Sequence, residues 1–285
     1  MCKKEKTMKK SWMILLAVVL TMCLAVFQRM SGPTYPKSGK VEVNGKKYAY
    51  KLPRSGTTGE ETVVKFPNVL DNTSGASTQA ASQGAFLYYR RYPLVEGEDY
   101  VKVPMRWQDG NWTASLPSRP QAGKWAYYIQ AEGVSYFADQ PVVIRYKGDV
   151  PAGILIPHIL LIFLAMFFAV MAGIASICNN PLYKRYCLLT VLFLLSGGFV
   201  FGCLVQYHAF GVYWSGFPLG GDFTDNKTLI ALLAFLAAWG VLVFRKQARW
   251  AVLAASIVML GVLCIPHSAN GSELNPETEC LESER

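Results

Sequence analysis

The sequence predicts an α-helical membrane bundle combined with an all-β extracytoplasmic domain, and three observations predict it. Five apolar stretches are each about long enough to cross a hydrocarbon core of roughly 30 Å as a helix that rises about 1.5 Å per residue. The long segment between the first two stretches alternates apolar and polar residues, which is typical of strands. Basic residues gather in every second connection. The apolar stretches are 11–28, 152–177, 187–207, 228–244 and 250–265.

The charge distribution predicts the side of the membrane that each connection occupies. Ten basic residues fall beside the apolar stretches in the N-terminal segment and in two short connections, which are therefore expected in the cytoplasm. Residues 29–151, the loop 208–227 and the acidic tail 266–285 are then expected outside. Much of the net charge of +9 has this topological origin, so it does not indicate a nucleic-acid partner. These ten residues are Lys3, Lys4, Lys6, Lys9, Lys10, Lys184, Arg185, Arg245, Lys246 and Arg249.

The first apolar stretch is interpreted as an uncleaved signal anchor. It has no A-x-A cleavage site before Ser31, which disfavours a cleaved signal peptide. A lipoprotein signal is the other alternative, since Leu20–Cys23 loosely resembles a lipobox, but Met22 is large for the position before the cysteine. The expected organisation is a basic tail and anchor helix (1–28), a β domain (29–151), four transmembrane helices (152–265) and an outer tail (266–285).

Turn residues divide the outer domain into short strands. Asn44-Gly45 predicts a type I′ hairpin, because both positions of that turn need positive φ, and Asp109-Gly110 and Glu132-Gly133 predict two further turns. Eight or nine short strands within 40–147 imply an antiparallel β-sandwich. The expected strands are 41–43, 47–50, 62–66, 85–92, 100–107, 112–116, 124–131, 134–137 and 141–146.

Two late segments of this domain carry a resemblance to a known class of module. They read Trp112-Thr113-Ala114-Ser115-Leu116-Pro117 and Pro120-Gln121-Ala122-Gly123-Lys124-Trp125-Ala126-Tyr127-Tyr128-Ile129-Gln130-Ala131. A proline-glycine corner before an aromatic strand resembles the late strands of immunoglobulin or fibronectin type III domains. The resemblance covers residues 40–147 and implies a fold, not a function. The Cys…Trp…Cys core of antibody domains is absent from this sequence.

The outer domain contains no residue pattern that indicates catalysis. It has neither histidine nor cysteine, and its carboxylates fall mostly in expected turns. Its most distinctive patch is 88–92, where Tyr88, Arg90 and Tyr92 share one face of a strand. This stripe is interpreted either as a carbohydrate- or partner-binding surface or as an ordinary amphipathic strand with its arginine head in solvent.

The membrane half lacks the charges that mark ion paths. No Asp, Glu, Lys or Arg lies within the apolar cores, which disfavours a proton-coupled transporter. Small residues recur at four-residue spacing, at Ala169 and Gly173 and at Gly198 and Gly202, and such pairs let helices approach closely. The seven cysteines show no C-x-x-C spacing and no covalent haem signature.

The predicted topology places all three histidines towards the outer face. His158, His208 and His267 could form a metal site for zinc, copper or iron with Asp222 and Asp225, or two imidazoles could ligate haem b. The alternative is structural: histidines tolerate interfaces, while Asp225 or Thr224 caps a helix and Asp222 makes a turn.

The loop 208–227 is too apolar to project into water. Tyr213, Trp214 and Phe217 are therefore predicted to anchor it at headgroup level. An interfacial enzyme is a further alternative, although Ser215 has no base beside it in the sequence and no recognised catalytic pattern is present.

These observations favour a multi-pass protein of the cytoplasmic membrane with its N-terminus inside and its C-terminus outside. The expected role is binding or scaffolding at the outer face, as an accessory or assembly subunit or as a sensor. The expected partners are the lipid bilayer and another membrane or extracytoplasmic protein. A metal- or haem-binding redox protein and an interfacial enzyme are the alternatives.

Overall fold

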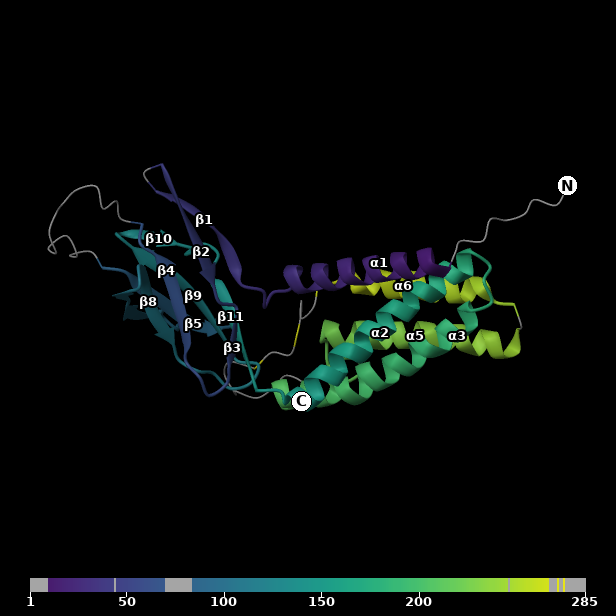
Figure 1. Cartoon of the computed structure of the whole chain (residues 1–285). Coiled ribbons are helices and arrows are strands. Elements are labelled where there is room, and N and C mark those ends of the chain that lie inside the picture. The colour runs from purple at the N-terminus through teal and green to yellow at the C-terminus, as the bar shows by residue number, and fades with distance from the viewer. Residues whose placement is uncertain are drawn as a thin grey trace. The chain divides into compact units, whose positions relative to one another are not determined.

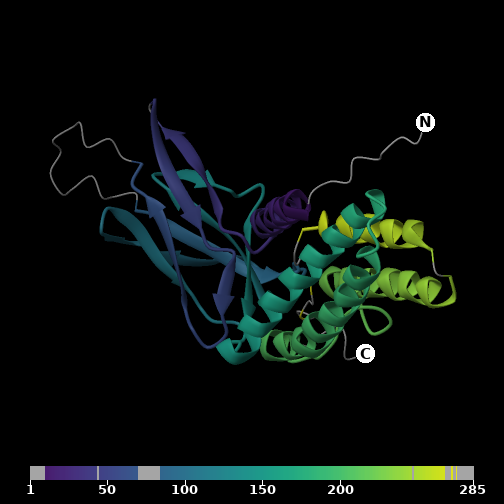
Figure 2. The ribbon, with the colours of Figure 1, turned by 45° about the vertical axis from the view of Figure 1, so that its right-hand side comes forward.

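The chain divides into two compact units in the computed structural model, which describes residues 10–43, 45–69, 84–245, 247–266, 271 and 274 (Figures 1 and 2). The helical unit comprises Met1–Pro33 and Val150–Gly271, and the β unit comprises Thr34–Asp149 and Ser272–Arg285. The expected combination of apolar helices with sheets is therefore present.

Four helical segments of the described chain are long and apolar enough to cross a membrane, as a multi-pass membrane protein requires. They are α1, α2, α5 and the continuous segment Tyr183–Phe210, in which α3 and α4 are joined by the π-helical turns Leu194–Phe201. The fifth predicted span differs, because α6 has 15 residues and a length of about 22 Å. The helices are α1 (Lys10–Ser31), α2 (Ala152–Ile177), α3 (Tyr183–Phe193), α4 (Gly202–Phe210), α5 (Phe223–Phe244) and α6 (Arg249–Leu263).

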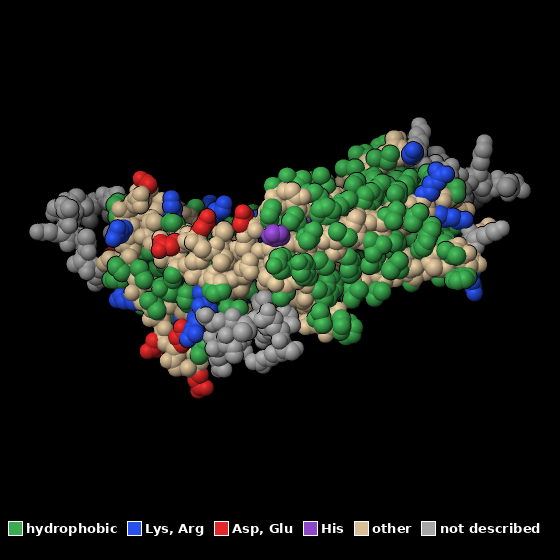
Figure 3. Space-filling view, turned by 90° about the horizontal axis from the view of Figure 1, so that it is seen from below, with side chains coloured by type: hydrophobic (Ala, Val, Ile, Leu, Met, Phe, Trp, Pro, Cys, Tyr) green, Lys and Arg blue, Asp and Glu red, His purple; other side chains and the backbone are tan. Residues whose placement is uncertain are grey.

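The surface of the helical unit suits an apolar solvent. Large apolar side chains are strongly exposed, among them Ile177, Phe244 and Trp250, and in water such a surface would be unfavourable (Figure 3). Several hydroxyl groups bond to the carbonyl four residues earlier in their own helix, so they need no water. These are Ser176, Thr190, Ser196, Thr228 and Ser256.

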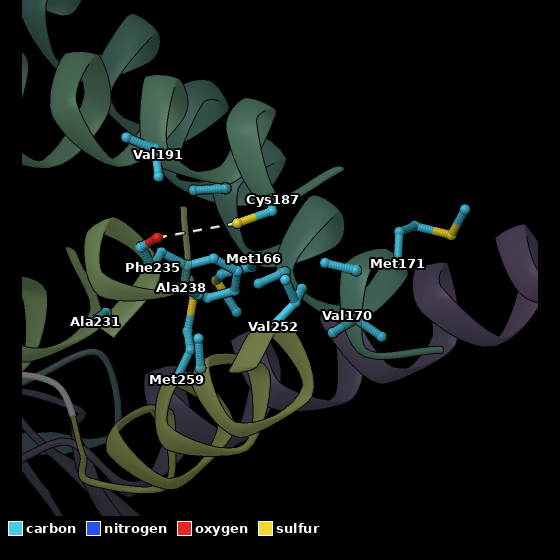
Figure 4. Close-up of a cluster of buried hydrophobic side chains, with 14 of the residues drawn as sticks. Met166, Val170, Met171, Cys187, Val191, Ala231, Phe235, Ala238, Val252 and Met259 are labelled. Atoms are coloured by element: carbon cyan, nitrogen blue, oxygen red, sulfur yellow. Dashed lines mark hydrogen bonds between the residues drawn. The ribbon is translucent and has the colours of Figure 1, made fainter. Parts of the chain in front are cut away.

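The helices share one buried core that includes the first helix. Met13 and Ala17 of α1 are buried in the same cluster as residues of α2, α3, α5 and α6, and α1 packs against α2. Phe235 lies fully buried near the middle of the cluster, and its carbonyl is 3.9 Å from Sγ of Cys187 (Figure 4). The predicted anchor helix is thus also a packed member of the helical unit.

Small residues set the closest approaches between helices. A Cβ added to Gly173 would lie 3.0 Å from Cβ of Ser256 in α6, and one added to Gly198 would lie 2.6 Å from Cγ2 of Thr228 in α5. One added to Gly197 would meet α2 at 2.7 Å from Cβ of Leu161. The expected small-residue surfaces are therefore interhelical contacts.

The β unit is built from short strands, most of them where the alternating pattern predicts them. Asp109 and Gly110 both have positive φ, as do Glu132 and Gly133, so these two turns have the backbone that the sequence implied. Gly45 also has positive φ, while Asn44 lies outside the described residues. The strands are β1 (Lys37–Val43), β2 (Lys46–Leu52), β3 (Ser55–Thr57), β4 (Thr62–Pro67), β5 (Phe86–Tyr92), β6 (Val101–Pro104), β7 (Arg106–Gln108), β8 (Asn111–Leu116), β9 (Lys124–Ala131), β10 (Val134–Tyr136) and β11 (Val142–Lys147).

Three sheets of the β unit enclose one core. Strands β1 and β2 form a hairpin, β4, β8 and β7 form a second sheet, and the largest sheet has the order β3-β11-β9-β5-β6 with β10 paired to β9. Side chains from all three sheets are buried in one cluster that includes Leu52, Phe66, Tyr127 and Ile144.

Two details of the β unit were not predicted. Strand β3 is absent from the expected set and pairs in parallel with β11, a long-range pairing that a three-residue segment cannot signal locally. The expected strand 100–107 is split at Met105, whose side chain is buried and whose N–H donates to the carbonyl of Ala85 at 2.8 Å. Burying Met105 moves the chain from the large sheet to the three-stranded sheet.

Candidate functional site

The loop between α4 and α5 is closed by a buried polar network centred on Ser215. Its hydroxyl accepts a hydrogen bond from Nε2 of Gln206 at 2.7 Å and lies within donating distance of Asp222 (3.3 Å) and Asp225 (3.2 Å). Its backbone N–H also donates to Asp225 at 2.7 Å, and Asp222 accepts from the N–H of Thr224 as the N-cap of α5. The expected cap was therefore wrong: Asp222, expected to make a turn, is the N-cap of α5 in place of Asp225 or Thr224.

The same end of the helical unit is joined to α6 by two long side chains. Lys227 donates to the carbonyls of Ile265 and Pro266, at 3.1 and 3.4 Å, beyond the end of α6. Gln28 of α1 donates to the carbonyl of Leu263 at 2.8 Å. Carbonyls at a helix C-terminus have no partner within the helix, so these bonds satisfy groups that lipid could not.

His158 is held against the π-helical turns rather than beside the two aspartates. Its Nδ1 lies 2.8 Å from the carbonyl of Gly197, and because a carbonyl only accepts, Nδ1 carries the hydrogen. In the neutral ring, Nε2 is then the atom with a lone pair. Gly202 lies beside the ring, and a Cβ added there would be in ordinary van der Waals contact with it, 3.6 Å from Cε1 of His158.

The other residues predicted at the outer face make ring contacts of their own. His208 lies in the last turn of α4, with its ring 5.8 Å from that of Tyr207. Tyr213 stacks on Tyr207 at 4.5 Å, and Trp214 stacks on Phe199 at 5.2 Å. Tyr213 and Phe217 are exposed, at 56% and 69%, and their role as interface anchors stays a prediction.

Ser215 brings Asp222 and Asp225 together, whereas His158 has a different partner. Among the described residues, no three His, Cys, Asp or Glu side chains gather so that they could hold a metal ion. His267 lies outside the described residues, so a metal or haem site that includes it stays a prediction.

The β unit presents a second candidate site on the outward face of its largest sheet. Tyr88 of β5 lies directly opposite Tyr128 of β9. The two rings stack with their centres 4.7 Å apart and an angle of 3° between their planes. Tyr100 meets Tyr128 edge-on at 4.9 Å. Arg90 lies 4.4 Å from the centre of the Tyr100 ring, and Lys102 lies 5.6 Å from that of Tyr88. We call these five residues the tyrosine–cation face.

The electrostatics of this face favour neutral hydroxyl groups beside fixed positive charges. Burial raises the pKa of Tyr128. The neighbouring rings Tyr88 and Tyr100 raise that pKa further, whereas the charge of Arg90 lowers it. The hydroxyl of Tyr128 therefore stays protonated at neutral pH and can donate a hydrogen bond. The hydroxyl of Tyr88 donates to Oε1 of Gln130 at 3.0 Å, which holds the stacked pair in place.

One residue of each candidate site was missed in the sequence. Gln206 is a polar residue within an apolar span, and such a residue is costly unless it is bonded, which was an available signal. Tyr128 was seen only as part of an aromatic strand, because its pairing with Tyr88 depends on a register between distant segments.

Comparison with known proteins finds no matching family model, no matching curated protein and no matching solved structure. The functional argument therefore depends on the two candidate sites alone.

Proposed function

We propose that this chain is an integral protein of the cytoplasmic membrane that holds its β unit outside and uses it to bind or scaffold another extracytoplasmic protein. The tyrosine–cation face is the single observation that carries this proposal. Tyrosine and arginine dominate the energetics of protein interfaces, because they offer large contact area and several hydrogen bonds. Rings already held by stacking lose little conformational entropy when a partner binds.

The orientation of this proposal is supported by the charges of the helical unit. Lys184 and Arg185 lie in the first turn of α3, Arg245 directly follows α5, and Arg249 begins α6. Figure 3 shows basic side chains gathered at one end of the apolar helical surface. By the positive-inside rule that end is cytoplasmic, and the loop between α4 and α5 is then outside.

The β unit is proposed to be a β-sandwich of the immunoglobulin-like kind. A six-stranded and a three-stranded sheet that share one core support this architecture. The proposal also retains the first helix as a signal anchor. An anchored recognition module of this kind suits an accessory or assembly subunit.

Site-specific photo-crosslinking in cells of the natural host tests the proposal. A photoreactive residue at Lys102 should form a discrete crosslink to one protein, and Arg90→Ala or Tyr128→Ala introduced in addition should remove it. The matched control is Trp107, which is 50% exposed and contacts Trp112 on the three-stranded sheet. Crosslinks of equal yield from Lys102 and Trp107, or no effect of Arg90→Ala, would contradict the proposed surface.

A further inference from the structure

The polar groups of the tyrosine–cation face are mostly hydrogen-bond donors. Arg90 and Lys102 supply only N–H groups, and the protonated hydroxyl of Tyr128 can donate as well. None of the neighbouring side chains on this side of β5, β6 and β9 carries a negative charge, so the face is positive. These neighbours are Phe86, Pro104, Ala126 and Gln130.

The two cations of this face are held by aromatic rings, not by carboxylates. Among the described residues, no carboxylate forms an ion pair with Arg90 or Lys102. Arg90 lies against the Tyr100 ring, and its Nε is buried without a hydrogen-bond partner in the described chain. Lys102 is exposed and lies 3.9 Å from the centre of the Phe86 ring. Arg90 therefore retains hydrogen-bonding capacity that these residues do not use.

We propose that the protein bound by the tyrosine–cation face presents a carboxylate to it, from an acidic surface segment, and that Arg90 and Tyr128 bind this carboxylate. A guanidinium matches a carboxylate through two parallel N–H···O bonds, which a lysine cannot reproduce. The surrounding rings exclude water and so strengthen the attraction between the charges. This inference rests on the proposed function and names the chemistry of the partner, which that function leaves open.

The positions of the two cations give them different roles towards an acidic segment. Lys102 is exposed at the border of the face. A charge in such a position acts mainly on the rate of association and on its salt dependence. Arg90 is half-buried among the tyrosines, where a hydrogen-bonded charge acts mainly on dissociation. Lys102 thus guides the acidic segment to the face, and Arg90 holds it there.

A series of substitutions at Arg90, read out by the photo-crosslink from residue 102, tests whether a carboxylate is bound. Arg90→Gln keeps a hydrogen-bonding side chain but removes the charge. It should lower the crosslink yield on the order of tenfold or more, because the partner carboxylate is left without its counter-charge. Arg90→Glu should abolish the crosslink by repulsion. A wild-type yield with Arg90→Gln, together with a loss in Arg90→Ala, would overturn the carboxylate while the proposed function stands.

A carbodiimide applied to membranes of the natural host identifies the partner group in the unaltered chain, so this test holds even if substitution of Arg90 disturbs the fold. The reagent activates a carboxylate, which forms an amide with Nζ of Lys102 while the carbodiimide leaves as a urea with the carboxylate oxygen. Mass spectrometry should find Lys102 joined to an aspartate or glutamate of the photo-crosslinked protein.

Lys65 of β4 is the matched control for this coupling, since it is also exposed but lies on the three-stranded sheet. It should not be joined to the same protein. A photo-crosslink from residue 102 without any amide at Lys102 would overturn the inference and leave the proposed function in place. A lipid or a polysaccharide joined to Lys102 in place of a protein would contradict both.

Discussion

The tyrosine–cation face and the Ser215 network use similar polar groups in opposite ways. In the network, Ser215 and Asp222 are 3% and 5% exposed and bond to groups of the same loop and helix. On the sheet, Tyr88 and Tyr128 are half-buried and leave ring faces and hydroxyl groups accessible. A polar group in an apolar environment must be satisfied internally, whereas one in water can exchange its partner for a ligand. The network of the helical unit therefore closes a loop, whereas recognition by the sheet stays a proposal.

The core of the β unit and the core of the helical unit also differ, because their side chains meet different solvents when the protein unfolds. Burial in the β unit removes apolar surface from water. Association of membrane helices has no such driving force and depends on close packing instead. Three predictions follow from the different environments of the two units, in order of decreasing effect.

Phe66→Ala and Phe235→Ala should have unequal costs although both side chains are fully buried. Phe66→Ala should lower the unfolding free energy of the β unit by about 3–5 kcal/mol, the usual loss for a buried phenylalanine in water. Phe235→Ala should lower the unfolding free energy less. Lipid tails contact the Phe235 ring when the helices separate, so its burial gains little transfer free energy. Hydrogen exchange in nanodiscs measures both, with the exposed Val63→Ala and Leu233→Ala as controls. Equal costs would show that the solvent difference does not matter here.

Gly197→Ala should destabilise the helical unit by about 1–3 kcal/mol, as overpacking does. Its added Cβ would lie 2.7 Å from Cβ of Leu161 and 3.1 Å from the backbone nitrogen of Ile162, and a backbone atom cannot move aside. Gly240→Ala in α5 is the control, because an added Cβ there meets nothing within 4 Å. Thermal unfolding in detergent should show a lower midpoint for Gly197→Ala alone. A tolerated Gly197→Ala would mean that the helices are not held at this distance.

Glu132→Gln should have the smallest effect, below about 1 kcal/mol, and only in the β unit, because water screens a partly exposed group. Burial raises the pKa of Glu132 above its ordinary value of 4.5, so folding favours the protonated form. Stability is then retained below pH 4.5 and lost as the pH rises through the folded-state pKa. Glu132→Gln should therefore stabilise the β unit at pH 7 but not at pH 4. Denaturant unfolding at the two pH values checks this, and a gain of equal size at both would rule out the titration.

Local patterns were sufficient to predict most elements. The apolar run of α2 was predicted from 152 to 177 and matches the helix Ala152–Ile177, and β9 matches the predicted 124–131. In both cases the signal lies within the segment itself, as period or as continuous apolarity. The exceptions are β3 and the break at Met105, where a partner from elsewhere in the chain decides the conformation.

The candidate sites were only partly predictable. Tyr88 and Arg90 were placed on one face from strand period alone, and Asp222 and Asp225 were linked because they are close in sequence. Tyr128, Gln206 and the carbonyl of Gly197 came into these sites from distant segments. Whether the three histidines converge depends on helix order, which a single sequence does not contain, and that grouping stays a prediction.

The sequence by itself determined the two kinds of unit, their order and the apolar nature of the helices, because these depend on composition and period. Tertiary structure decided the register that stacks Tyr88 on Tyr128, the burial of Lys124 beside Arg145 and the partner of His158. The physical reason is that each of these contacts joins segments far apart in the chain. Their formation depends on how whole sheets and helices pack, and no local pattern of residues encodes that packing.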